Sequence, residues 1–128
     1  GLWSSLGIIE PFEEDMKKAL ELDPTIQNGG PNRALGKLYL ELPFFLGGST
    51  SQAIDHLKES VRLGPDHAEN HLGLAEAYYS NNNFTAARKS LSTLQRLIHN
   101  VEDDEDLLKL RTKGQELMNK MAFESQEP

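Results

Sequence analysis

The sequence predicts an all-α protein in which antiparallel helix pairs stack in series, an α-solenoid closed by a C-terminal capping helix. The first observation is an internal repeat: residues 35–40 resemble residues 74–79, with a leucine, a small residue and a tyrosine at the same spacing. The second is that apolar residues recur every three or four positions, the period of one helix face. The third is the position of Pro24 and Pro65, each directly after such a pattern, where proline separates one unit from the next.

The repeat unit is 34 residues long once one insertion is set aside. Ala53 recurs as Ala87 after 34 residues, whereas the segment 35–40 recurs after 39. The five extra residues therefore lie between these landmarks, in the stretch 43–48. A helix–turn–helix unit of this length cannot bury its apolar face alone, so stacked neighbours supply the core.

The N-terminal residues predict part of a further helix. Leu2, Trp3 and Leu6 are expected to form the last turns of a helix that starts in a preceding segment missing from this chain. Gly7 is expected to break that helix, and Pro11, a favourable first-turn residue, to restart it.

The remaining elements follow from caps and breakers. We expect helix pairs at 32–42 with 50–63 and at 67–80 with 84–99, and a last helix at 104–122. The chain (1–128) is then one domain made of a partial repeat (1–24), a repeat with a turn insertion (29–65), a second repeat (68–101) and the capping helix (104–122).

Composition excludes several classes of function. The chain has 128 residues, no cysteine and a net charge of −7. Without cysteine there is no disulfide framework and no thiolate metal site. The longest uncharged stretch is too short and too polar to span a membrane, so we expect a soluble chain without direct membrane insertion. The negative charge argues against nucleic acid as a partner. Most of it lies at the two ends, because residues 31–100 carry six acids against seven bases.

A 34-residue helix–turn–helix unit resembles the tetratricopeptide repeat. The matching residues are the leucines, small residues and tyrosines of both units: Leu35, Gly36, Tyr39, Ala53, Leu57 and Pro65, then Leu74, Ala75, Tyr78, Ala87 and Leu91. Asn82 stands at the turn glycine, where asparagine tolerates left-handed backbone. The resemblance implies a non-catalytic module that binds other proteins.

A longer phrase is similar to bacterial tetratricopeptide proteins related to the T component of TRAP transporters. It runs from Leu35-Gly36 through Pro43 and Gly47-Gly48, and continues with Ala53, His56-Leu57, Asn70-His71, Leu74-Ala75-Glu76 and Ala86-Ala87-Arg88. That resemblance implies a periplasmic accessory protein, lipid-anchored through an N-terminal cysteine, that associates with the transporter's substrate-binding subunit. This chain lacks the cysteine, so any such anchor belongs to the missing segment.

Three local motifs have ordinary structural explanations. His67 and His71 have metal-ligand spacing but no third ligand, so we expect a helix start and not a metal site. The acids at 102–106 lack the spacing of a calcium loop and are expected to cap the last helix. Gly47-Gly48-Ser49 lacks the lysine of a phosphate loop and is expected to be a turn followed by an N-cap. We expect no catalytic residues and no cofactor.

The candidate binding surface is the concave groove lined by the first helix of each pair. Its expected residues are basic, apolar and acidic side chains of those helices: Arg33, Lys37, Leu40, Glu41, Glu69, Leu72, Glu76 and Tyr79. Arg33, Lys37 and Tyr79 are the expected contacts for a protein or peptide segment. The equally weighted alternative is that these faces are simply solvated.

The insertion contributes Phe44, Phe45 and Leu46, which we expect to tuck over the ends of the first helix pair, the alternative being an exposed apolar contact. Two further functions stay open. The groove with this loop over it would hold a small hydrophobic or anionic ligand, or the chain would self-associate through Trp3 and Leu6 at its N-terminal edge.

Overall fold

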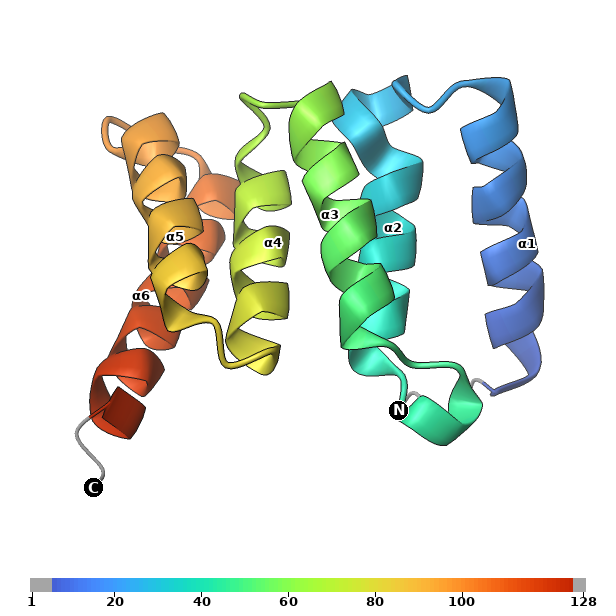
Figure 1. Cartoon of the computed structure of the whole chain (residues 1–128). Helices are drawn as coiled ribbons and strands as arrows, with labels where there is room; N and C mark the ends of the chain where they lie inside the picture. The colour runs from blue at the N-terminus through green and yellow to red at the C-terminus, as the bar shows by residue number, and fades with distance from the viewer. Residues whose placement is uncertain (1–5, 126–128) are drawn as a thin grey trace.

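The computed structural model describes residues 6–125, which form six α-helices and one short 3₁₀ turn (Figure 1). In chain order these are α1 (Leu6–Leu22), α2 (Ile26–Glu41), the turn η2 (Phe44–Leu46), α3 (Thr50–Leu63), α4 (Ala68–Ser80), α5 (Phe84–Ile98) and α6 (Glu105–Ser125). No strand occurs in this range, and the predicted all-α fold is confirmed. None of the helices described combines the length and apolar character that crossing a bilayer requires.

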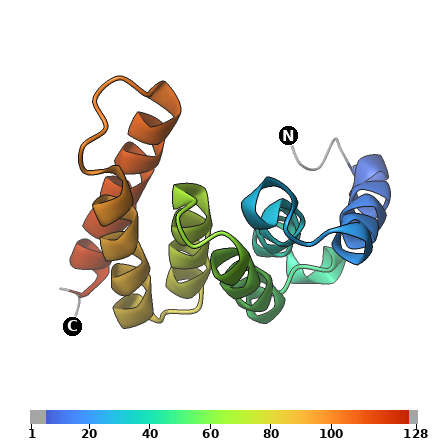
Figure 2. The same ribbon diagram turned by 90° about the horizontal axis from the view of Figure 1, so that it is seen from above.

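The helices form two packed pairs with a further helix at each end. α2 pairs with α3, and α4 pairs with α5, while α3 also contacts α4 and so joins the pairs. Seen from above, α2 and α4 lie on one side of the stack and α3 and α5 on the other (Figure 2). α6 packs on both α4 and α5, whereas α1 contacts only α2 among the described helices.

Two apolar clusters form the core. One lies among α2, α3 and α4 and contains Leu35, Tyr39 and Leu57, with side chains of α1 packed against its edge. The other lies among α4, α5 and α6 and contains Leu91, Leu94 and other side chains that are almost fully buried. Because α4 contributes buried side chains to both clusters, it joins the two helix pairs.

The predicted caps are confirmed at three positions. Ser49 Oγ accepts a hydrogen bond from the Gln52 backbone N–H (3.1 Å) at the start of α3. Asp104 Oδ1 accepts from Asp106 N–H (3.0 Å) and from Leu107 N–H (3.1 Å), so the acidic stretch caps α6. Asn82 has φ of 58°, the left-handed conformation expected at the turn. Each side chain or turn satisfies backbone groups that a helix end leaves unpaired.

The predicted break in the first helix is wrong. α1 runs through both Gly7 and Pro11. Proline at position 11 leaves the carbonyl of Gly7 without its helical donor, and Gly7 is exposed, so water can donate to that carbonyl instead. Trp3 lies outside the described residues.

The insertion forms a closed loop at the end of α2. Gly47 has φ of 102°, and a Cβ on Gly48 would lie 1.8 Å from the Leu42 carbonyl oxygen, so only glycine fits at either position. Gly48 N–H donates to Pro43 O (2.9 Å) and Ser49 N–H to Tyr39 O (2.9 Å). The double glycine is therefore explained by the turn itself.

The expectation that the loop tucks its aromatic residues away is wrong for Phe44 and Phe45. Phe44 is 87% exposed and Phe45 66% exposed, although Leu46 is half-buried. The two rings contact each other edge to face, with centroids 5.7 Å apart. The loop closes on its own backbone, which leaves these rings outside the core.

Leu57 of α3 fills a gap between two glycines on different helices. A Cβ on Gly36 of α2 would lie 2.5 Å from Leu57 Cγ, and one on Gly73 of α4 would lie 2.8 Å from Leu57 Cδ2. Leu57 itself is completely buried. The close approach of α2, α3 and α4 therefore depends on small residues at these two positions.

Substituting Gly36→Ala should lower the free energy of unfolding by about 1–3 kcal/mol, because the added methyl group overlaps Leu57. Gly7→Ala is the matched control, since nothing lies within 4 Å of a Cβ at Gly7. Urea denaturation followed by circular dichroism measures both variants. Equal stability of the two variants would contradict this packing.

Candidate functional site

A buried asparagine connects three helices beneath the face that α2 and α4 share. Asn70, near the start of α4, is fully buried. Its Nδ2 lies within hydrogen-bond distance of the carbonyl oxygens of Asn28 (2.9 Å), Ser60 (2.9 Å) and Gly64 (3.0 Å), and its two N–H groups are shared among these three acceptors. Its Oδ1 accepts from Arg33 Nη1 (2.8 Å). One side chain thus binds the start of α2, the end of α3 and the Arg33 side chain together.

The segment that Asn70 holds has unusual backbone geometry. Gln27, Asn28 and Gly29 have φ of 52°, 58° and 83°, so three consecutive residues are left-handed before the regular part of α2 begins. Left-handed backbone costs about 1–2 kcal/mol for each non-glycine residue, so other contacts must offset it. Arg33 Nη2 donates to Gln27 O (3.2 Å), and Gly29 lies against Ser60, where a Cβ would lie 3.0 Å from the Ser60 backbone.

The two predicted basic contacts share one carboxylate. Lys37 Nζ forms an ion pair with Glu69 Oε1, and Arg33 Nε lies 3.8 Å from Glu69 Oε2. Burial opposes ionisation of Glu69, but its hydrogen bond to Lys37 and the charges of Lys37 and Arg33 outweigh that burial and lower the pKa of Glu69. The structure therefore brings Arg33, Lys37 and Glu69 together across α2 and α4, with their charges largely satisfied.

Glu41 and Glu76 are the acids of this face that make no ion pair within residues 6–125. Both side chains reach solvent, yet the surrounding protein atoms partly desolvate Glu76. That desolvation raises the pKa of Glu76, and the charges of Glu41 and Glu69 raise it further, against opposite effects from Lys37 and Lys113. A carboxylate with these surroundings favours an added cation.

The remaining predicted groove residues have other contacts. Leu72 is 3% exposed and belongs to the core between α4, α5 and α6, so it cannot form the floor of an open groove. Leu40 is half-buried and packs against the core of α2, α3 and α4. Tyr79 stacks on Phe84 with centroids 5.6 Å apart, and its hydroxyl donates to Glu124 of α6. α6 thus contacts the Tyr79 end of the predicted groove.

The two histidines of α4 have structural surroundings. His67 is the residue that precedes α4, as expected for a helix start, and His71 is buried with Nε2 2.6 Å from the Pro65 carbonyl oxygen. His67 Nε2 has no hydrogen-bond partner and lies 3.8 Å from Glu69 Oε2. Between residues 6 and 125, no three His, Asp or Glu side chains gather closely enough to hold a metal ion.

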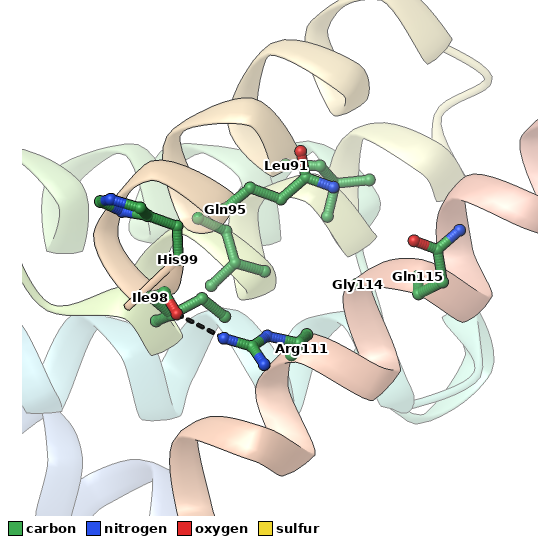
Figure 3. A pocket seen from close by; sticks show the side chains of 8 residues that line it. Leu91, Gln95, Ile98, His99, Arg111, Gly114 and Gln115 are labelled. Atoms are coloured by element: carbon green, nitrogen blue, oxygen red, sulfur yellow. Dashed lines mark hydrogen bonds between the residues drawn. The ribbon is translucent and has the colours of Figure 1, made fainter. Parts of the chain in front are cut away.

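A hollow of about 260 Å³ lies between α5 and α6, away from the predicted groove (Figure 3). Arg111 of α6 crosses its lower edge, where Nη2 donates to the carbonyl oxygens of Ile98 (2.7 Å) and Val101 (2.9 Å). These bonds satisfy carbonyl groups at the end of α5. Arg111 therefore acts as a helix cap at the edge of this hollow.

Sequence reasoning missed the clamp formed by Asn70 and the left-handed segment. The run Gln27-Asn28-Gly29-Gly30 does contain residue types that favour left-handed backbone. Asn70 carries no comparable signal, because an asparagine within a helix is usually exposed and only the fold buries this one.

Substituting Asn70→Ala should lower the free energy of unfolding by about 2–4 kcal/mol, since the hydrogen bonds of a buried amide to three backbone carbonyls and to Arg33 are lost. Asn100→Ala, at an exposed position, should change it by about 0.5 kcal/mol or less. Thermal and urea unfolding compare the variants, and a near-neutral Asn70→Ala would show that the clamp does not hold the helices.

The unfolding free energy should fall between pH 7.5 and 5.5. Burial lowers the pKa of His56, and burial together with Arg33 lowers that of His67. As the pH decreases toward and below the ordinary histidine pKa of about 6.5, the unfolded chain therefore binds more protons than the folded chain. The free energy of unfolding decreases as a result. His67→Gln should reduce this pH dependence, and Asn100→Gln, an exposed position without a titratable group, should not. Identical profiles for the two variants would contradict the prediction.

Comparison with known proteins agrees with the fold. A sequence model of the tetratricopeptide repeat family matches residues 45–114, more than half of the chain, from the insertion loop into α6. A comparison with curated proteins gives no match. Repeats of this family generally mediate protein–protein interaction. The stacked helix pairs, their 34-residue period and the matched segment together show that this chain belongs to the tetratricopeptide repeat family.

Proposed function

We propose that this protein is a non-catalytic interaction module that binds a peptide segment of a partner protein along the face shared by α2 and α4. The observation that carries the proposal is the pair Glu41 and Glu76, two acids without ion pairs beside a fixed polar network. A basic side chain from a partner would supply the missing cation. No reaction is assigned to the module.

The arrangement supports recognition by a rigid surface. Arg33 and Lys37 are already held by Asn70 and Glu69, so they keep the face ordered. The charges on this face without an ion pair are then those of Glu41 and Glu76. Preformed geometry reduces the entropy lost on binding. This changes the roles predicted from sequence, because Arg33 and Lys37 become supports and the acids become the contacts.

The small-ligand alternative finds less support in the geometry. Its expected pocket lay under the insertion loop, but Phe44 and Phe45 point away from the core, and the hollow beside α2 is lined by residues of α1 instead. We therefore retain the peptide-binding proposal.

For the partner we propose a periplasmic substrate-binding subunit of a TRAP-type transporter. The support is the sequence phrase that includes Leu35-Gly36 and Asn70-His71. Gly47 and Gly48, although part of the same phrase, give no support to this partner, since the loop geometry accounts for them. We expect the purified subunit to co-elute with this chain. The Glu76→Lys variant should lose this co-elution.

Substituting Glu76→Lys should weaken binding of a basic peptide about tenfold or more, because it replaces the attractive charge with a repulsive one. Peptides selected from a random displayed library against the whole chain serve as probes, and calorimetry measures their affinity. Asp55→Lys, an exposed position on α3, is the matched control. Selected peptides that bind both variants equally well would reject the proposed face.

A further inference from the structure

α6 adds basic side chains beside the face that α2 and α4 share. α6 packs on α4, and the Tyr79 hydroxyl of α4 donates to Glu124 of α6. This bond identifies the side of α6 that turns toward the face. Lys120 lies four residues before Glu124 and Lys113 eleven residues before it, about one and about three helical turns, so both lysines share that side of α6.

Lys113 lies close enough to Glu76 to affect its ionisation. Partial desolvation raises the pKa of Glu76, and the positive charge of Lys113 opposes that rise. The two side chains nevertheless form no ion pair, and neither pairs with another residue between 6 and 125. Lys113 is exposed and lines an open hollow of about 490 Å³ on α6, together with Lys109, Thr112 and Glu116. Its ammonium group is therefore accessible to a partner.

The charges without an ion pair change sign from α2 and α4 to α6. Glu41 of α2 and Glu76 of α4 are acidic, whereas Lys113 of α6 is basic. Glu116 is an acid one helical turn from Lys113, but Lys109 is a base one turn away on the other side, so the two balance. Two acids and a base thus lie in order across three packed helices.

The spacing of the helices sets the spacing of the groups that these charges would bind. Packed helices lie about 8–10 Å apart, and an extended chain rises about 3.3 Å per residue. A segment that crosses from Glu76 to Lys113 therefore needs about three residues, whichever way it runs. A segment with basic side chains alone would bring like charge to Lys113, which opposes binding.

We infer that the partner segment is extended and carries both signs of charge. Its lysine or arginine lies beside Glu41 and Glu76, and its aspartate or glutamate, about three residues away, lies beside Lys113. The inference rests on the proposed function and names the kind of segment that the face binds.

The first test compares the peptides that different forms of the protein select. A random displayed library is screened against the whole chain, against Lys113→Glu and against the matched control Lys89→Glu, at an exposed position on α5. The whole chain and the control should select peptides with an acid about three residues from a base. Lys113→Glu should select a second base in place of that acid. An acid that is equally frequent in all three selections would overturn the inference.

Calorimetry on one selected peptide measures the same contact directly. Lys113→Glu should weaken its binding about tenfold or more, and Lys89→Glu should leave it unchanged. Replacing the acid of the peptide by lysine should restore binding to Lys113→Glu and weaken binding to the unchanged protein. Because an unfolded variant would bind neither peptide, this exchange of preference separates a lost contact from lost stability. Loss of both peptides by a variant with unchanged circular dichroism would contradict the inference.

The outcomes also separate this inference from the proposed function. If Glu76→Lys weakens the selected peptides and Lys113→Glu does not, the inference is wrong and the proposed face stands. The same conclusion follows if the selected peptides carry basic side chains alone. If neither variant changes binding, the proposed face and the inference are both wrong.

Discussion

The structure depends on the hydrogen bonds of one buried amide. Asn70 joins the left-handed segment before α2 to the end of α3, and its oxygen fixes Arg33 above them. Without these bonds the strain of three left-handed residues would have few contacts to offset it. The position of α2 relative to α4, and with it the arrangement of Lys37, Glu69 and Glu76, follows from this clamp. A residue without any chemical role in binding therefore positions the residues proposed to bind.

Much of the fold was predictable because its signals are local. The helix pairs at 32–42 with 50–63 and 67–80 with 84–99 follow from apolar period and caps, and Ser49 and Asp104 behave as their residue types suggest. The predicted helix break near Gly7 is wrong because one glycine or one proline disfavours a helix only weakly when the backbone carbonyl left without a donor is exposed to water. The predicted burial of Phe44 and Phe45 is wrong for another reason. Their exposure depends on how the loop closes, and the backbone hydrogen bonds of Gly48 and Ser49 determine that closure.

The site was less predictable, since helical position identifies a face but not the contacts made on it. Arg33 and Lys37 were expected to meet a partner, and the sequence could not show that Glu69 would occupy both. Leu72 and Tyr79 were expected in the groove, but Leu72 packs in the core with side chains of α5 and α6, and the Tyr79 hydroxyl bonds to Glu124 of α6. Such outcomes depend on the distance between helices far apart in the chain, here set by Asn70 and by Leu57 between two glycines.

The insertion loop adds its residues to one repeat outside the helices of that repeat. Gly48 N–H and Ser49 N–H donate to carbonyl oxygens of Pro43 and Tyr39, so the loop closes on the end of α2 immediately before α3 starts. The bonds that close the loop are backbone bonds, whereas the Phe44 and Phe45 side chains are exposed. Replacing these two side chains would therefore change the outer surface of the repeat and leave the bonds that connect its two helices in place.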